Sequence, residues 1–135
     1  MRILPRLLPF LSALCLGGAC TDSLCGCTPR YGPLLKVTPD MFLDSAAVGS
    51  TTPRVMTIEV INDGSGELRW RAFVRHASPW LTMTPDTGTA GVTPAPQLQA
   101  NPTGLAVGIY RDTVIVADRA GTGSLQVPVE FRIYP

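Results

Sequence analysis

Aromatic residues and histidine are scarce in this chain, and their scarcity limits the chemistry open to it. Phe, Trp and Tyr make up 7% of the 135 residues, and His76 is the single histidine. Histidine is the commonest general acid–base group and the commonest metal ligand in proteins. We therefore expect no enzyme activity, no metal site and no cofactor.

Charged residues are also few, and neither sign dominates. Asp, Glu, Lys and Arg account for 16% of the residues, and the formal net charge is +1. Nucleic-acid binding needs clustered positive charge that replaces the counterions on phosphate groups. The chain has no basic block, so we expect no nucleic-acid partner.

Long hydrophobic runs are absent as well. Crossing a bilayer takes about 20 apolar residues, whereas the apolar run from Leu7 to Leu16 is roughly half that length. This run follows Arg2 and Arg6, and small residues follow it up to Cys20. The order of basic, apolar and small residues predicts a secretory signal peptide over residues 1–19.

The cysteine that ends this segment makes it resemble a bacterial lipoprotein signal, in which that cysteine is cleaved free and acylated. The resemblance implies a lipid anchor on Cys20 and a place in the cell envelope, on a bacterial membrane. Secretion or periplasmic release after ordinary cleavage at Ala19, and an uncleaved N-terminal anchor, stay open. Ordinary cleavage would leave three thiols (Cys20, Cys25 and Cys27), an odd number in an oxidising compartment, while acylation leaves an even pair.

Residues 20–33 are rich in Gly, Pro, Ser and Thr and show no apolar periodicity, so they predict a flexible tether. All four cysteines precede residue 28, so the fold does not depend on disulfides. The remaining residues, 34–135, suit one domain.

Thirteen glycines, thirteen prolines and many short alternating stretches indicate an all-β domain. We predict an immunoglobulin-like β-sandwich of about seven or eight antiparallel strands. The expected strands are 34–38, 41–43, 55–61, 67–74, 80–83, 97–100, 109–116 and 125–133.

Two hairpins are expected among these strands. One joins 55–61 to 67–74 through the turn at 62–66, and the other joins 109–116 to 125–133. Pro128 should mark a sheet edge, where its missing N–H does no harm. The alternation predicts an inward-facing set in the last strand: Leu125, Val127, Val129, Phe131 and Ile133.

Several short motifs follow one another along the chain in the order typical of one family. They are Asn62-Asp63-Gly64-Ser65-Gly66-Glu67-Leu68-Arg69-Trp70, Ser78-Pro79-Trp80-Leu81, Thr84-Pro85-Asp86-Thr87-Gly88, Gly108-Ile109-Tyr110 and Val127-Pro128-Val129. Over roughly residues 34 to 134 the succession resembles the BACON domain, a surface-associated immunoglobulin-like module. The family name records a proposal of carbohydrate binding, while many members are spacers or interaction modules.

Sugar binding needs flat aromatic rings beside hydrogen-bonding groups, because a pyranose ring presents a C–H face. Trp80 and Tyr110 are the aromatic candidates that we single out, with Phe73 a further one; Trp70 is expected in the core. Alternatively, Trp80 packs under the rim of the sandwich and Tyr110 is a structural corner tyrosine.

Arg69, Arg71 and Arg75 recur with the period of a strand and are expected on one face. Such a row could contact acidic glycans, lipid head groups or a protein partner. The alternative is a solvated strand face whose arginines pair with Glu59 and similar neighbours.

Catalytic and metal-binding arrangements receive less support. His76 and Ser78 could join an Asp in a triad, but closeness in sequence is no evidence for one. The two carboxylates that glycoside hydrolysis needs would have to be members of one set: Asp63, Glu67, Asp86, Asp112 or Asp118. Calcium could bind oxygens of Asn62, Asp63 and Glu67, although a plain Asx turn explains the same residues.

The sequence therefore predicts a non-catalytic binding module, anchored to the envelope by lipid, for glycan or for an envelope protein. The competing prediction is a structural spacer or assembly module that docks a partner through an edge strand, without glycan binding. An exposed aromatic ring with polar neighbours would favour glycan, an uncovered edge would favour assembly, and a deep pocket would favour catalysis.

Overall fold

Ten strands and no helix make up residues 32–135, the part of the chain that the computed structural model describes. The strands are β1 (Leu35–Thr38), β2 (Phe42–Ala47), β3 (Arg54–Thr57), β4 (Glu59–Asn62), β5 (Arg69–Val74), β6 (Leu81–Thr84), β7 (Thr87–Thr89), β8 (Gln97–Ala100), β9 (Gly108–Asp118) and β10 (Ser124–Tyr134). The predicted signal peptide at 1–19, Cys20 and nearly all of the predicted tether lie outside the described residues. Within the described residues, no helix is long and apolar enough to cross a membrane.

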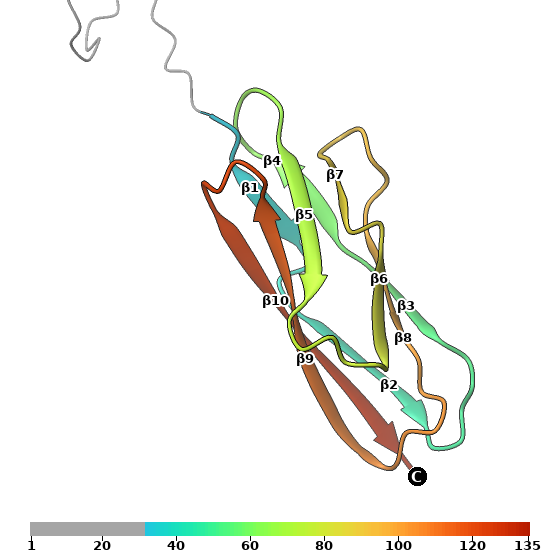
Figure 1. Ribbon diagram of the computed structural model, residues 1–135. Helices are drawn as coiled ribbons and strands as arrows, with labels where there is room; N and C mark the ends of the chain where they lie inside the picture. The colour runs from blue at the N-terminus through green and yellow to red at the C-terminus, as the bar shows by residue number, and fades with distance from the viewer. Residues whose placement is uncertain (1–31) are drawn as a thin grey trace, which may run out of the picture.

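The strands form the two layers of a β-sandwich (Figure 1). One layer is a five-stranded sheet in the order β2-β10-β9-β5-β7. The other contains the three-stranded sheet β3-β8-β6 and the pair β1-β4. All pairings are antiparallel except that of β2 with β10. The all-β sandwich expected from the sequence is confirmed.

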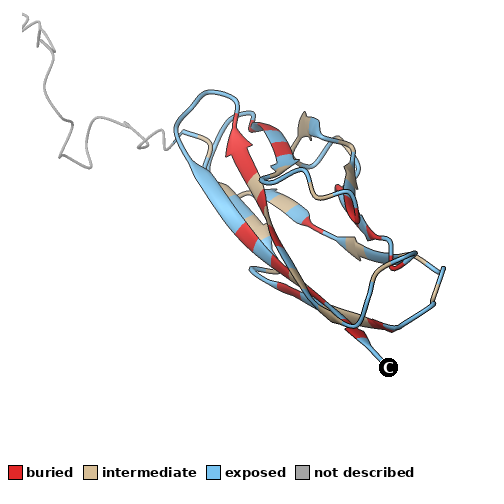
Figure 2. Cartoon of the chain, turned by 60° about the horizontal axis from the view of Figure 1, so that its bottom comes forward, coloured by how far each residue is buried: buried red, intermediate tan, exposed pale blue. Residues whose placement is uncertain are grey.

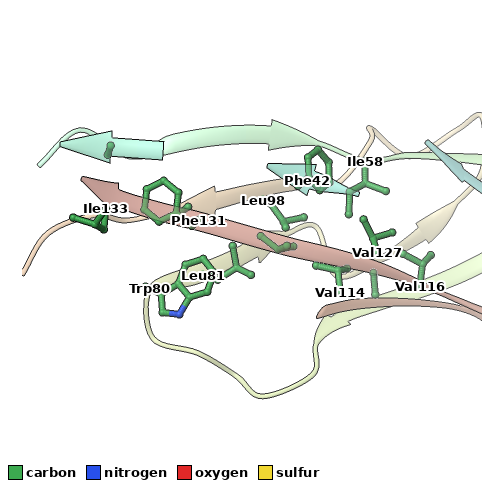
Figure 3. Close-up of a cluster of buried hydrophobic side chains, with 14 of the residues drawn as sticks. Phe42, Ile58, Trp80, Leu81, Leu98, Val114, Val116, Val127, Phe131 and Ile133 are labelled. Atoms are coloured by element: carbon green, nitrogen blue, oxygen red, sulfur yellow. The ribbon is translucent and has the colours of Figure 1, made fainter. Parts of the chain in front are cut away.

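Side-chain alternation fills the space between the layers, as the alternating red bands of Figure 2 show along the strands. In β10 the predicted inward residues Val127, Val129, Phe131 and Ile133 are buried, while Leu125, near the hairpin turn, is 38% exposed. Phe131 lies among the clustered apolar side chains of both layers (Figure 3). Burial of such side chains is the main source of stability in a sandwich of this kind.

The two predicted hairpins have different outcomes. The pair β9–β10 is a hairpin, as expected, with register from Ser124 opposite Ala117 to Ile133 opposite Gly108. The hairpin of 55–61 with 67–74 is wrong. Residues 54–62 form two strands, of which β3 pairs with β8 and β4 pairs with β1, while β5 pairs with β9 and β7.

Ile58 is the reason for this division. Its side chain is fully buried, and its N–H donates to the carbonyl of Pro96, 2.9 Å away, in the segment that leads into β8. The chain therefore changes partners at Ile58. This division, together with the short β7, brings the number of strands to ten instead of seven or eight.

The prediction that Pro128 marks a sheet edge is wrong, because it lies in β10, between β2 and β9. Pairing of β10 with β2 begins only at Val129. Thr113 is opposite Pro128, and its carbonyl faces β5, where it accepts from the N–H of Arg75 at 2.8 Å. By alternation the nitrogen of Pro128 points away from β9, to the side where β2 has not yet begun. The missing N–H therefore leaves no ladder bond unmade.

Strand β2 is one of the two edge strands of the five-stranded sheet, and the side chain of Asp44 caps one of its edge N–H groups. The Asp44 carboxylate accepts from the N–H of Ser45 at 2.6 Å. The pairing of Ser45 with Arg132 turns the backbone of Ser45 towards the free edge. A charged side chain that caps an edge N–H discourages the addition of a further strand there.

Candidate functional site

Asp112 is the centre of a polar cluster that forms where the loop between β5 and β6 packs against β9. It lies on β9 with its side chain fully buried. Its Oδ1 accepts from the N–H of Thr113 at 2.7 Å, from the N–H of His76 at 3.2 Å, and contacts His76 Nδ1 at 3.0 Å. Its Oδ2 accepts from the hydroxyl of Ser78. One carboxylate thus joins the loop to β9.

The same contacts decide the charge of this group. Burial alone would raise the pKa of Asp112, but the hydrogen bonds from Ser78, Thr113 and His76 outweigh burial and lower that pKa to about 2. Asp112 is therefore ionised at neutral pH, and its carboxylate is a weak base.

The cluster contains the residue types of a Ser-His-Asp triad in a different order. In a triad the histidine lies between serine and aspartate and takes the proton of the serine. Here Asp112 lies between His76 and Ser78, and the serine hydroxyl donates to the carboxylate. Among the hydrogen bonds of residues 32–135, both Ser78 and the His76 ring bond to Asp112 and not to each other, so the arrangement fits a structural link between loop and strand.

The two aromatic candidates have structural roles. Trp80 is only 8% exposed, stacks on Phe131 with 5.9 Å between ring centroids and meets Tyr110 edge-on at 6.1 Å. The hydroxyl of Tyr110 donates to the carbonyl of Ala106 at 3.0 Å, which is the bond of a corner tyrosine. Trp80 packs beneath the rim, so it presents no open ring face to a sugar.

The arginine row divides at the end of β5. Arg69 and Arg71 lie on the outer face of the strand, while Arg75 follows it in a turn. Arg69 is paired with Glu67. The expected neighbour Glu59 lies instead on β4, in the other layer.

Arg71 and Phe73 form the exposed aromatic–cation pair of the described chain. The guanidinium carbon of Arg71 lies 6.0 Å from the centroid of the Phe73 ring, and Phe73 is 43% exposed. Cross-strand register puts Thr87 opposite Arg71 and Ile115 opposite Phe73. We call these four residues the Arg71–Phe73 surface. Sequence periodicity suggested Arg71 and Phe73, but Thr87 and Ile115 join them only through register.

The remaining carboxylates are dispersed or engaged. Asp118, at the end of β9, accepts from the N–H of Ala120 at 2.8 Å and from the Thr122 hydroxyl, and these bonds lower its pKa. Asn62 Oδ1 accepts from the N–H of Gly64 at 3.1 Å, as in an Asx turn. Within residues 32–135, no three His, Cys, Asp or Glu side chains gather in a way that could hold a metal ion.

Comparison with solved structures shows the fold at low sequence identity. The PapD-like domain 7 of human CEP192 is 10% identical, with a TM-score of 0.55 over 87% of this chain and 98% of that domain. SSP-19, an MSP-domain-like protein of Caenorhabditis elegans, is 13% identical, with a TM-score of 0.53 over 73% of this chain and 99% of that one. No curated protein matches the chain.

Comparison with protein families gives a more specific result. The family described as the viral BACON domain matches residues 34–130. The match covers nearly all of the sandwich, including the motifs at 62–70 and 108–110 that carry the resemblance. The chain therefore belongs to the viral BACON domain family.

Proposed function

We propose that this protein is a lipid-anchored, non-catalytic binding module of the cell envelope that recognises an acidic glycan through the Arg71–Phe73 surface. Its family and fold support a binding module that does no chemistry. The inverted order of Ser78, Asp112 and His76 agrees with that role. The observation that carries the ligand class is the Arg71–Phe73 pair itself.

The two side chains offer complementary parts of a glycan site. Among residues 32–135, no carboxylate forms an ion pair with Arg71, whereas Glu67 pairs with Arg69 and Glu130 with Arg111. A free guanidinium can bind a carboxylate or sulfate through two parallel hydrogen bonds. The exposed Phe73 ring can receive the C–H face of the sugar that bears this group. Uronic-acid or sulfated polymers provide both features in each repeating unit.

Affinity electrophoresis of the full-length chain tests this site, with polygalacturonate as the acidic probe and dextran as the neutral one. We expect retardation by polygalacturonate only. Arg71→Gln should weaken it on the order of tenfold, because a charged hydrogen bond is lost. Phe73→Ala should weaken it by several-fold through the loss of the ring contact.

Arg54→Gln is the matched control, since Arg54 is an exposed arginine on β3, in the opposite layer. It removes the same charge and should bind as the unaltered chain does. Equal retardation in dextran, or equal losses in Arg54→Gln and Arg71→Gln, would show that the Arg71–Phe73 surface does not select acidic glycans.

The lipid anchor has its own test, because it rests on the signal sequence alone. We expect mass spectrometry of the protein from its native membrane fraction to find a diacylglyceryl-type mass on Cys20. Several acyl chains hold a protein firmly on a membrane, since each buried CH₂ contributes about 0.8 kcal/mol. Cys20→Ser should lose the added mass and move to the soluble fraction. An unmodified, soluble chain beginning near Cys20 would favour a secreted protein instead.

A further inference from the structure

Residues of β5, of β6 and of the loop 75–80 that connects them line a groove. Figure 1 shows the two strands and this loop. Its volume is about 420 Å³. Asp86 is the one charged residue in its lining. The apolar part of the lining includes Ala72, Phe73, Val74, Pro79, Leu81 and Met83.

The β6 wall of this groove exposes backbone hydrogen-bonding groups. Asn101 N–H donates to the carbonyl of Trp80 at 2.8 Å, so the backbone of Trp80 faces β8. By alternation, the backbone N–H and C=O of Thr82 also point towards β8, while those of Leu81 and Met83 point away from it. The N–H of Leu81 donates to Ser78 O at 3.0 Å. The carbonyl of Leu81 and both backbone groups of Met83 are left without a partner among the described residues.

The β5 wall exposes further groups of the same kind. The backbone N–H of Arg75 points towards β9, where it donates to the carbonyl of Thr113. By alternation, the backbone groups of Val74 and Ala72 point away from β9, towards the groove. Strand β7 pairs with β5 only as far as Arg71. Asp86 O accepts from the N–H of Ala72 at 2.7 Å, and Ala77 N–H donates to Val74 O at 3.3 Å. Among residues 32–135, the carbonyl of Ala72 and the N–H of Val74 have no partner and face the groove.

We propose that this groove binds an extended peptide segment of a partner protein, which adds to the sheet edge as a short strand. Unpaired N–H and C=O groups on both walls supply main-chain hydrogen bonds, and the apolar lining supplies pockets for alternate side chains. The carboxylate of Asp86 complements a Lys or Arg of the segment. This peptide site shares Phe73 with the Arg71–Phe73 surface, but Arg71 does not line the groove, and the peptide is held through backbone groups of β5 and β6.

The two sides of the sandwich differ in how far their edge backbone groups are available to a partner strand, and this difference supports peptide binding at the groove. There, Asp44 caps an edge N–H of β2. On the groove side, Pro79 and Pro85 bracket β6, so only about four residues can pair with it before a proline interrupts the ladder. The prolines also disfavour extended pairing of two copies of β6, which makes a foreign segment the better occupant.

The probe for this site is a library of capped octapeptides in which apolar residues alternate with randomised ones, selected against the full-length chain. We expect selected peptides to carry Lys or Arg at one fixed position, through attraction to Asp86. In hydrogen exchange, a bound peptide should slow the Val74 and Met83 amides by about tenfold or more. Asp86→Lys should change the selected residue at the fixed position to Asp or Glu.

Asp40→Lys is the control, because Asp40 is an exposed acid outside the groove lining. It should select the same peptides as the unaltered chain. A library without binders, bound peptides that leave both amides unprotected, or an unchanged selection by Asp86→Lys would each overturn the proposal. Arg71→Gln separates this site from the glycan site, since it should weaken polygalacturonate binding and leave peptide binding unaltered.

Discussion

Asp112→Ala is expected to lower the free energy of unfolding by about 3–5 kcal/mol, because several donors lose a buried, charged acceptor together. Those donors are the backbone N–H groups of His76 and Thr113, the His76 ring and the Ser78 hydroxyl. Without the carboxylate, the loop that connects β5 to β6 loses its attachment to β9. Urea denaturation monitored by tryptophan fluorescence measures the change.

The pH dependence of the free energy of unfolding separates the contribution of the negative charge of Asp112 from that of its packing. Its pKa falls from 3.8 to about 2 on folding, against the effect of burial and through the hydrogen bonds from Ser78, Thr113 and His76. Because the folded pKa is the lower one, the stabilisation is complete above about pH 4 and is lost as the pH falls to about 2. A shift of this size corresponds to about 2 kcal/mol. Asp112→Asn should remove this part of the acid sensitivity.

Asp86→Asn is the control for both measurements. Asp86 is exposed, and the bond that it accepts from the N–H of Ala72 is made by its backbone carbonyl, which the substitution leaves in place. We expect it to change stability by less than about 0.5 kcal/mol. Similar losses in the Asp86 and Asp112 variants, or an unaltered acid transition in Asp112→Asn, would contradict the role assigned to the Asp112 cluster.

Phe131→Ala is the second change with a large expected effect, about 3–5 kcal/mol. The Phe131 side chain is fully buried, and its ring stacks on Trp80 with an interplanar angle of 13°. Truncation removes the apolar contacts and leaves a cavity beneath Trp80, which the surrounding strands can fill only in part. The unfolding midpoint should fall, and Trp80 emission in the folded state should move to longer wavelength.

Phe73→Ala provides the matched control, since it removes the same ring from the outer face of β5. Phe73 is partly exposed, so its loss should cost less than about 1 kcal/mol. If the two Phe→Ala variants were equally stable, the stacked position of Phe131 in the core would be wrong.

Strand positions were predictable because alternation is a local property. In β10 each apolar residue predicted to face inward from Val127 onwards is buried. The β9–β10 hairpin was predictable for a related reason, since its strands are close in the chain and joined by a short turn. The segment 55–61 shows the limit, because alternation continues through Ile58 although the chain changes pairing partners there.

The candidate sites required long-range register. His76 and Ser78 are near each other in sequence, but Asp112 is 36 and 34 residues away from them, and only the pairing of β5 with β9 brings it between them. Trp80 illustrates the same limit for exposure. Its position after a proline beside a loop was compatible with an open platform or a packed rim, and contact with Phe131 decided for the rim.

The sequence by itself determined the all-β class, the faces of most strands, the family motifs and the core position of Trp70. Tertiary structure alone decided which strands pair, that Asp112 separates Ser78 from His76, that Phe73 rather than Trp80 is the open ring, and that a groove with unpaired backbone groups lies between β5 and β6. The physical reason is that alternation and turn preference depend on a few neighbouring residues. Strand partnership and side-chain exposure depend instead on contacts between residues far apart in the chain, which no local pattern records.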